Sequence, residues 1–328
     1  MQLGKLSAKQ LNDFIFSKLN IKNKEVILGP KVGEDCSVLD LGDNLCVMST
    51  DPITGASKDI GKLAININVN DIASNGVRPI GVMVTLLLPE NILEEELKNI
   101  LNSLSEECDK LGIDILGGHT EITKAVNQPI INITAIGKKN RDIYYKKEEL
   151  KTGDLILITK GIAIEGCGII FNEKENELKN IFRQEEIEQG KKLLEEISVL
   201  KEGLIGGQLG IKYMHDVTEG GILGALYEAS NSLNKGLLVS KDKIHIENLK
   251  QKLCKYYNID PLKLISSGSM LVIASKEKIK KYQEELSEIN IKTYVIGEVI
   301  DDLGFYFVQE DKKIKIDEVC SDELYKVV

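Results

Sequence analysis

The chain has 328 residues, which is enough for two domains of roughly 150 residues each. Hydrophobic residues make up 42% of it and charged residues 28%, a balance that is typical of a globular protein and excludes an intrinsically disordered one. The net charge of −9, from 51 acidic and 42 basic residues, argues against a nonspecific nucleic-acid-binding protein.

Strands and helices alternate along the first half of the chain. Apolar runs bounded by turn residues predict strands at 44–50 and 79–88. Helical spacing of apolar residues predicts helices at 60–74 and 91–111, the second of which ends at Gly112. Two more strands follow at 113–118 and 129–137, and we expect the first of these to be buried.

The second half shows the same alternation after a strongly charged segment at 138–150. The predicted strands are 151–160, 268–275 and 293–300, and the predicted helices are 184–200, 219–230 and 276–289. The glycine-rich stretch at 159–168 lacks the Lys-Ser/Thr of a P-loop, and we interpret it as a turn. These elements predict an α/β protein with two domains, at 1–145 and 146–328.

The cysteines and the N-terminus bear on cellular location. The six cysteines are scattered without a C-x-x-C pair, which argues against a structural zinc site and against a disulfide framework. The N-terminal segment lacks the apolar core of a signal peptide, and no apolar run reaches the length of a membrane span. We therefore expect a soluble, cytoplasmic protein.

Asp71 falls on the apolar side of the helix predicted at 60–74. At about 100° per residue, Ala64 and Ile67 share a face with this carboxylate. A desolvated carboxylate must be paired, hydrogen-bonded or bound to a metal. Two more carboxylates, Asp35 in GEDCS and Asp51 in STDPITG, lie at predicted turns. The three can supply oxygen ligands for Mg²⁺, although turn or helix N-cap roles are the alternative for Asp35 and Asp51.

Two further segments combine glycines with polar residues. In LGGHTEIT (116–123), the Gly-Gly pair lets the backbone approach a ligand, and the alternative is a tight turn. In MHDVTEGGILGALYE (214–228), the N-terminus of a helix can meet an anion, and the alternative is capping by Thr218 or Asp216. Together with the carboxylates, these loops predict a site for a magnesium-complexed polyphosphate.

In this order, the segments resemble the AIR synthase-related superfamily of ATP-using enzymes. GEDCSVLD is similar to the family's Gly-Asp-Asp-Ala-Ala segment, and STD and the run at 59–89 are similar to its next two blocks. GGHTE and HDVTEGGILGALYE are similar to the fourth and fifth blocks. The resemblance implies two α/β domains, with the N-terminal domains of two subunits pairing into a β-barrel. It also implies ATP and Mg²⁺ in a cleft at that homodimer interface.

Carried over position by position, the resemblance implies three groups of site residues. The metal ligands would be Asp35, Asp51 and Asp71. The groups beside the nucleotide and its phosphates would be Thr50, Asn70, Gly117 and Gly118. The catalytic groups would be His119, His215 and Asp216, with the latter two reaching from the second domain toward the substrate. Metal ions and pre-aimed donors would stabilise the charge on the transferred phosphoryl group.

Within the superfamily, the sequence motifs and their spacing are most similar to those of the HypE-like branch. In that branch, a carboxamide on the enzyme's C-terminal cysteine becomes a nitrile-type group. This chain departs from that pattern because it ends in VCSDELYKVV, and we interpret Cys320 as an ordinary semi-buried thiol. Glu34 also replaces the usual first Asp of the opening motif, and His119 stands where several relatives carry Asp.

These comparisons within the superfamily leave three functional hypotheses. The first is a HypE-like, ATP-dependent enzyme that phosphorylates an amide or carboxyl-type oxygen for dehydration or ligation, with hydrogenase-maturation proteins as partners. The second is a small-molecule kinase of the thiamine-monophosphate kinase type. The third is a nucleotide-binding scaffold or regulator with little turnover, which the changes at Glu34, His119 and the C-terminus suggest.

Overall fold

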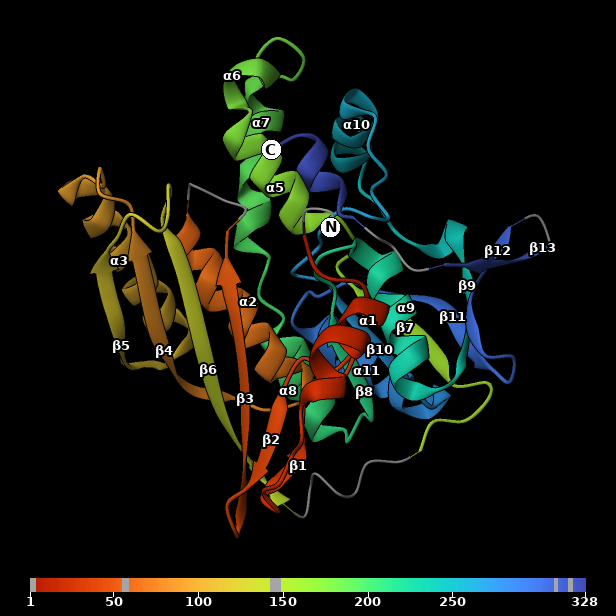
Figure 1. The fold of residues 1–328 in the computed structure, drawn as a ribbon. Helices are drawn as coiled ribbons and strands as arrows, with labels where there is room; N and C mark the ends of the chain where they lie inside the picture. The colour runs from red at the N-terminus through yellow and green to blue at the C-terminus, as the bar shows by residue number, and fades with distance from the viewer. Residues whose placement is uncertain (1–3, 55–58, 142–148, 310–311, 318–320) are drawn as a thin grey trace.

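The computed structural model describes residues 4–54, 59–141, 149–309, 312–317 and 321–328 (Figure 1). Two mixed β-sheets, one from each half of the chain, organise these residues and confirm the predicted two-domain α/β fold. The expected boundary at 145/146 and Cys320 both lie outside the described residues. Among the helices that the structure describes, none combines the length and the apolar composition needed to cross a bilayer.

The first sheet has six strands in the order β1-β2-β3-β6-β4-β5. Their bounds in that order are Val26–Leu28, Ser37–Asp40, Asn44–Ile53, Ile130–Asn140, Pro79–Leu88 and Asp114–Ile122. Only β4 and β5 run parallel. Helices α2 (Ile60–Ser74) and α3 (Glu94–Leu111) cover one face of the sheet (Figure 1). The predicted helix at 60–74 is confirmed, and α3 ends at Gly112 in the left-handed conformation (φ 65°), as expected.

Strand β5 corrects one expectation, because we expected a buried strand at 113–118. The strand runs from Asp114 to Ile122 at the edge of the sheet, and each of its residues is exposed. Its apolar side chains include Ile115 and Leu116, which are 45% and 53% exposed. An apolar composition therefore does not reveal which strand of a sheet lies at its edge.

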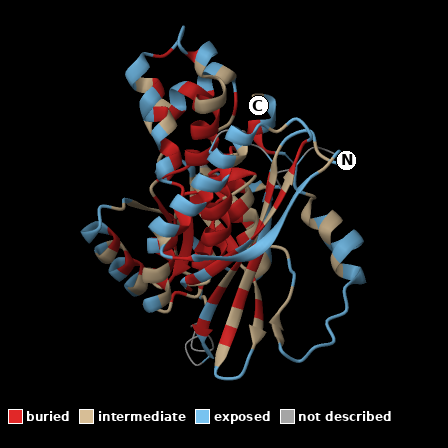
Figure 2. Cartoon of the chain, turned by 90° about the vertical axis from the view of Figure 1, so that its left-hand side faces the viewer, coloured by how far each residue is buried: buried red, intermediate tan, exposed pale blue. Residues whose placement is uncertain are grey.

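Helix α2 corrects a second expectation, that of a single apolar face. Of its 15 residues, 14 are buried, because the sheet lies on one side and α3 and the second domain lie on the others. Figure 2 shows how the buried residues concentrate in the helices at the centre of the molecule. Asp71 is therefore not a single polar residue on an otherwise apolar face of the helix. It is one of several buried polar side chains, each of which needs a hydrogen-bond or ionic partner.

The second sheet has seven strands in the order β13-β12-β9-β11-β7-β10-β8. Their bounds in that order are Lys312–Ile316, Gly304–Gln309, Gly236–Ser240, Thr293–Ile300, Leu155–Thr159, Met270–Ala274 and Tyr213–Asp216. Ile156 and Ile158 of β7 pack in a core with α9 (Gly221–Leu233). Leu157 packs on the opposite face with α11 (Lys276–Glu288) and α8 (Leu200–Gln208). Because helices cover both faces, β7 and β10 are almost wholly apolar.

The other helical segments are α1 (Ala8–Gln10), η1 (Leu11–Ile15), η2 (Phe16–Lys18), α5 (Ile164–Glu173), α6 (Glu175–Leu178), α7 (Gln184–Lys191), η3 (Lys192–Glu195), η4 (Lys241–Lys243), α10 (Asn248–Tyr257) and η5 (Glu323–Lys326). Of these segments, α5, α6, α7 and α10 lie toward the top of the view in Figure 1.

Two expectations in this region are wrong. The glycine-rich stretch at 159–168 is not only a turn, because α5 begins within it. Gly166 and Gly168 are helical here, and a Cβ atom on either would lie within 3 Å of a neighbouring leucine side chain. The single helix predicted over 184–200 is divided into α7, a 3₁₀ turn and a loop that leads to α8.

Candidate functional site

A cavity of about 850 Å³ lies between the two domains. Asp35, Asp51 and Asp71 all line it, although they come from a loop, from β3 and from α2. The second domain contributes other lining residues, including Glu165 and Ser267. The fold therefore brings together the three carboxylates that the sequence singled out.

Helix α2 holds the Asp71 side chain rigidly at the wall of this cavity. Asp71 is 4% exposed, and its Oδ2 accepts a hydrogen bond from the Ser49 hydroxyl of β3. Burial raises the pKa of Asp71 well above its usual range, and the nearby charges of Asp216, Asp51 and Asp35 raise it further. The serine hydrogen bond opposes these effects, because it favours the charged form. The site thus holds more negative charge than the protein around it neutralises.

Asp35 is positioned by the loop between β1 and β2, which packs against the second domain. Gly33 in this loop has a φ of 78°, and a Cβ there would lie 2.8 Å from the Glu228 carbonyl oxygen. Only glycine allows both the backbone conformation and this close approach. The loop brings Oδ2 of Asp35 to 2.8 Å from Nδ1 of His215 and to 3.2 Å from the Ser74 hydroxyl.

His215, at the end of β8, links the two domains. It is 3% exposed, and its Nδ1–H donates to Asp35 while its Nε2–H donates to Oε2 of Glu228 at 3.2 Å. Burial alone would lower the pKa of His215, but the two carboxylates outweigh that effect and raise it well above the usual range. Burial alone would raise the pKa of Glu228, but His215 and Lys5 lower it to about 2. The raised pKa favours the imidazolium form of His215, and the ring holds Asp35 in place.

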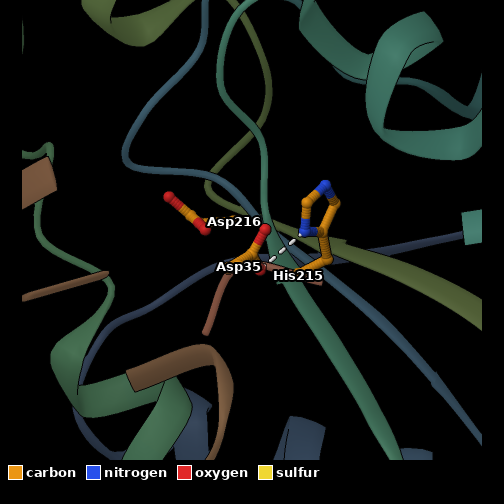
Figure 3. Close-up of side chains that lie close together, drawn as sticks. All are labelled: Asp35, His215 and Asp216. Atoms are coloured by element: carbon orange, nitrogen blue, oxygen red, sulfur yellow. Dashed lines mark hydrogen bonds and ion pairs between the residues drawn. The ribbon is translucent and has the colours of Figure 1, made fainter. Parts of the chain in front are cut away.

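Asp216, the next residue, is fully buried. Neither of its carboxylate oxygens has a hydrogen-bond partner among the described residues. Burial raises the pKa of Asp216 to about 8, and the charge of Asp35 adds to the rise while His215 opposes it. Figure 3 shows its carboxyl group beside the carboxyl group of Asp35 and the imidazole ring of His215, and the ligand atoms of the three residues lie within 4.8 Å of one another.

These residues fit a divalent cation. Carboxylate oxygens are the ligands that Mg²⁺ prefers, and the unpartnered oxygens of Asp216 sit next to Asp35. Burial, with the neighbouring negative charges, raises the pKa values of Asp51, Asp71 and Asp216, and a cation would reverse these shifts. Among the described residues, His215 and Lys5 already pair with Glu228, so a buried group of carboxylates here favours a bound cation.

Thr50 and Asn70, the two expected nucleotide contacts, have different placements. Thr50 lines the cavity from β3, and its hydroxyl donates to the Ile133 carbonyl at 3.0 Å. Asn70 is fully buried away from the cavity lining. Its amide nitrogen donates to the Ile197 carbonyl and its oxygen accepts from the Val199 N–H, both at 2.8 Å. Asn70 therefore ties α2 to the second domain in this structure.

The structure does not bring Gly117, Gly118 and His119 to the carboxylates. They lie on β5, which β4 and β6 separate from β3. His119 is exposed, and its Nε2 lies 3.2 Å from Oε2 of Glu121. Within one chain, these three residues form a second location rather than part of the cavity.

Several residues around the cavity were not predicted from the sequence. Glu228 and Lys5 pair at 3.0 Å beside His215, and no local pattern marks Lys5. Glu165 offered a signal, since a carboxylate within GIAIEGCGII interrupts an apolar run as Asp71 does. The N-terminus of α9, where we expected an anion or a cap from Thr218 or Asp216, is instead met by Asp322, whose Oδ2 accepts the Gly220 N–H at 2.7 Å.

Family models match both halves of the chain. The N-terminal domain of AIR synthase related proteins matches residues 33–138, and the C-terminal domain of the same family matches residues 151–309. The chain belongs to the AIR synthase related protein family.

Among curated proteins, the chain is similar to three kinds of family member. It is 27% identical to a protein of Methanocaldococcus jannaschii named for hydrogenase expression/formation, over 96% of this chain and 92% of that protein. It is 24% identical to the carbamoyl dehydratase HypE of Escherichia coli, over 83% and 82% of the two chains. It is 29% identical to the selenide, water dikinase of Haemophilus influenzae, over 73% and 68%.

Solved structures share the fold. Escherichia coli HypE has a TM-score of 0.74 at 21% identity, and covers 94% of this chain and 96% of its own. A HypE in complex with ATP has a TM-score of 0.69 at 19% identity, with 96% of both chains covered. A HypE–HypF complex has a TM-score of 0.71 at 23% identity, with 88% and 94% covered.

Proposed function

We propose that this protein is a HypE-like, ATP-dependent enzyme that phosphorylates an amide or carboxyl-type oxygen in hydrogenase maturation. The observation that carries the proposal is the convergence of Asp35, Asp51 and Asp71 on one interdomain cavity, with the buried Asp216 beside Asp35. Similarity to hydrogenase expression/formation proteins supports the pathway, and the ATP complex of a HypE with the same fold supports the nucleotide.

In this proposal, Asp35, Asp51 and Asp71 hold Mg²⁺, and Asp216 adds a fourth carboxylate. When bound, Mg²⁺ would neutralise phosphate charge and stabilise the phosphoryl group during transfer. The Thr50 hydroxyl, on the cavity wall, contacts the nucleotide. His215 is a positioning residue, since it fixes Asp35 through a 2.8 Å hydrogen bond and is itself fixed by Glu228.

We also propose that the working unit is a homodimer. The exposed apolar residues of β5 and the uncovered face of the first sheet are surfaces that pairing of two N-terminal domains into a β-barrel would bury. Such pairing would give Gly117, Gly118 and His119 a route to the cavity of the other subunit. Sedimentation velocity tests this, because a monomer at micromolar concentration would contradict it.

The decisive experiment measures ADP release with Mg²⁺–ATP over a panel of carboxamides, carboxylates and alcohols, with identification of the products. A dehydrated or ligated product together with ADP and phosphate supports the synthase reaction. A stable phosphorylated metabolite would instead support a small-molecule kinase, which the similarity to a selenide, water dikinase favours. Tight nucleotide binding without turnover on the whole panel would support a scaffold. Absence of nucleotide binding would contradict all three.

A further inference from the structure

The end of the cavity that belongs to the second domain holds a second group of polar residues, apart from the four aspartates. Glu165 lies in the first turn of α5, and Ser267 lies in the loop before β10. Both line the cavity and both are almost completely buried, at 3% and 0% exposed. The Ser267 N–H donates to Oε2 of Glu165 at 3.3 Å, which holds the carboxyl group toward the loop.

The Ser267 hydroxyl has no hydrogen-bond partner of acceptable geometry among the described residues. It lies near the Glu165 carboxyl group, close enough to lower the pKa of that group, but makes no well-formed hydrogen bond to it. A buried hydroxyl without a partner costs free energy unless a ligand or water satisfies it. Because Ser267 lines a large cavity, a ligand that binds against this residue can satisfy the hydroxyl.

The charges around this end of the cavity disfavour an anionic ligand. Lys5 is the only cation among the described residues that line the cavity, and Glu228 already pairs with it at 3.0 Å. The N-terminus of α9, another place for an anion, is met by Asp322. Glu219 also lines the wall here. An uncharged group with its own N–H or O–H donor suits a carboxylate beside a hydroxyl, whereas a phosphate monoester would meet uncompensated negative charge.

We propose that Glu165 and Ser267 form the acceptor subsite of this cavity, where Glu165 takes the proton of an uncharged acceptor such as a primary carboxamide. This inference rests on the proposed function. The acceptor oxygen forms a bond to the γ-phosphorus, the bond from that phosphorus to the β,γ-bridging oxygen breaks, and ADP leaves with the electron pair. The N–H proton of the carboxamide moves to Oε of Glu165 and is released to water later. The Ser267 hydroxyl hydrogen-bonds the acceptor and orients it.

The electrostatic environment of Glu165 suits proton exchange near neutral pH. Burial raises its pKa to about 7, the N–H hydrogen bond and the nearby hydroxyl of Ser267 oppose the rise, and the charges of Asp322 and Glu219 add to it. A group with a pKa near the working pH transfers protons most effectively.

The test compares Glu165→Gln with the wild type in Mg²⁺–ATP binding by calorimetry and in ADP release with acetamide as the probe. We expect the rate of acetamide-dependent ADP release to fall about 100-fold, with unchanged nucleotide affinity. Formate should restore part of the rate in Glu165→Ala, which a merely structural role would not allow. Ser267→Ala should raise the KM for acetamide about 2- to 10-fold, the effect of one hydrogen bond.

The matched control is Glu298→Gln on β11, an exposed residue that should leave every parameter unchanged. Wild-type rates in Glu165→Gln would overturn the inference and leave the proposed function standing. Faster ADP release with glycerol 3-phosphate than with acetamide would also overturn it, because the subsite would then prefer an anion. A wild-type protein that binds no Mg²⁺–ATP would instead refute the proposed function itself.

Discussion

Replacing Asp71 by Asn removes one negative charge from the centre of the cavity while it keeps the size of the side chain and one oxygen. The Ser49 hydroxyl can still donate to the amide oxygen, so the fold should survive. Without Mg²⁺, the wild type binds more protons folded than unfolded, because burial and neighbouring carboxylates raise the pKa of Asp71. Its stability therefore falls as pH rises from about 4 through the raised pKa, and the variant should lose less stability over that range.

The loss in Mg²⁺–ATP affinity follows from Coulomb's law. At an effective dielectric constant of about 20, a unit charge about 4 Å from another contributes about 4 kcal/mol, and the remaining amide oxygen reduces the loss to roughly 2–4 kcal/mol. This corresponds to a Kd that rises about 30- to 700-fold, which isothermal titration calorimetry can measure. An unchanged Kd together with a large fall in the melting temperature would show that Asp71 is structural and would refute the reasoning.

Three further substitutions separate the roles of other residues. Asn70→Ala should destabilise the fold by about 2–4 kcal/mol in urea denaturation, because it leaves two buried backbone groups unpaired. The ATP affinity of this variant should stay near that of the wild type, and a selective loss of affinity would show a nucleotide contact instead. His215→Gln should cost more stability at about pH 6 than at about pH 9. The pKa of His215 is raised in the folded protein, so the protonated histidine stabilises the fold below its pKa in the unfolded chain, and this stabilisation is lost as the pH rises through its pKa in the folded protein. An equal cost at both pH values would contradict this expectation. Gly118→Ala should disrupt the β4–β5 pair, because Gly118 has a φ of 151° and a Cβ there would lie 1.8 Å from the Val84 carbonyl oxygen. Retention of the wild-type melting temperature and sedimentation coefficient would contradict that expectation.

Local sequence patterns were sufficient where one element determines the structure. The apolar spacing from Ile60 to Ser74 predicted α2 to the residue, and Gly112 marked the end of α3 through its left-handed backbone. The same patterns failed where packing between elements decides the outcome. The glycine-rich stretch that contains Gly166 and Gly168 was interpreted as a turn, but these two glycines lie in α5 and allow it to pack closely against neighbouring leucines. The apolar residues of β5 predicted a buried strand. This prediction was wrong because β5 lies at the edge of the sheet, and that position depends on strand order.

For the site, the sequence supplied the residue types but not their partners. Asp35, Asp51 and Asp71 could be grouped as candidate Mg²⁺ ligands by residue type and position, but 36 residues separate the first from the last and their convergence requires the folded sheet. The contact between Asp35 and His215 spans 180 residues, and no local rule predicts it. Asn70 shows the opposite case, since its place within the motif suggested a nucleotide contact while its hydrogen bonds tie two domains together.

The most direct test of the account is a crystal structure of the protein with Mn²⁺ and a non-hydrolysable ATP analogue. Mn²⁺ takes the oxygen ligands that suit Mg²⁺, and its anomalous scattering locates it without ambiguity. The account predicts an anomalous peak in contact with the carboxylates of Asp35, Asp51 and Asp71 and beside Asp216, with the analogue's phosphates next to it in the interdomain cavity. A nucleotide bound elsewhere, or a cavity without metal at saturating concentrations of both, would contradict it.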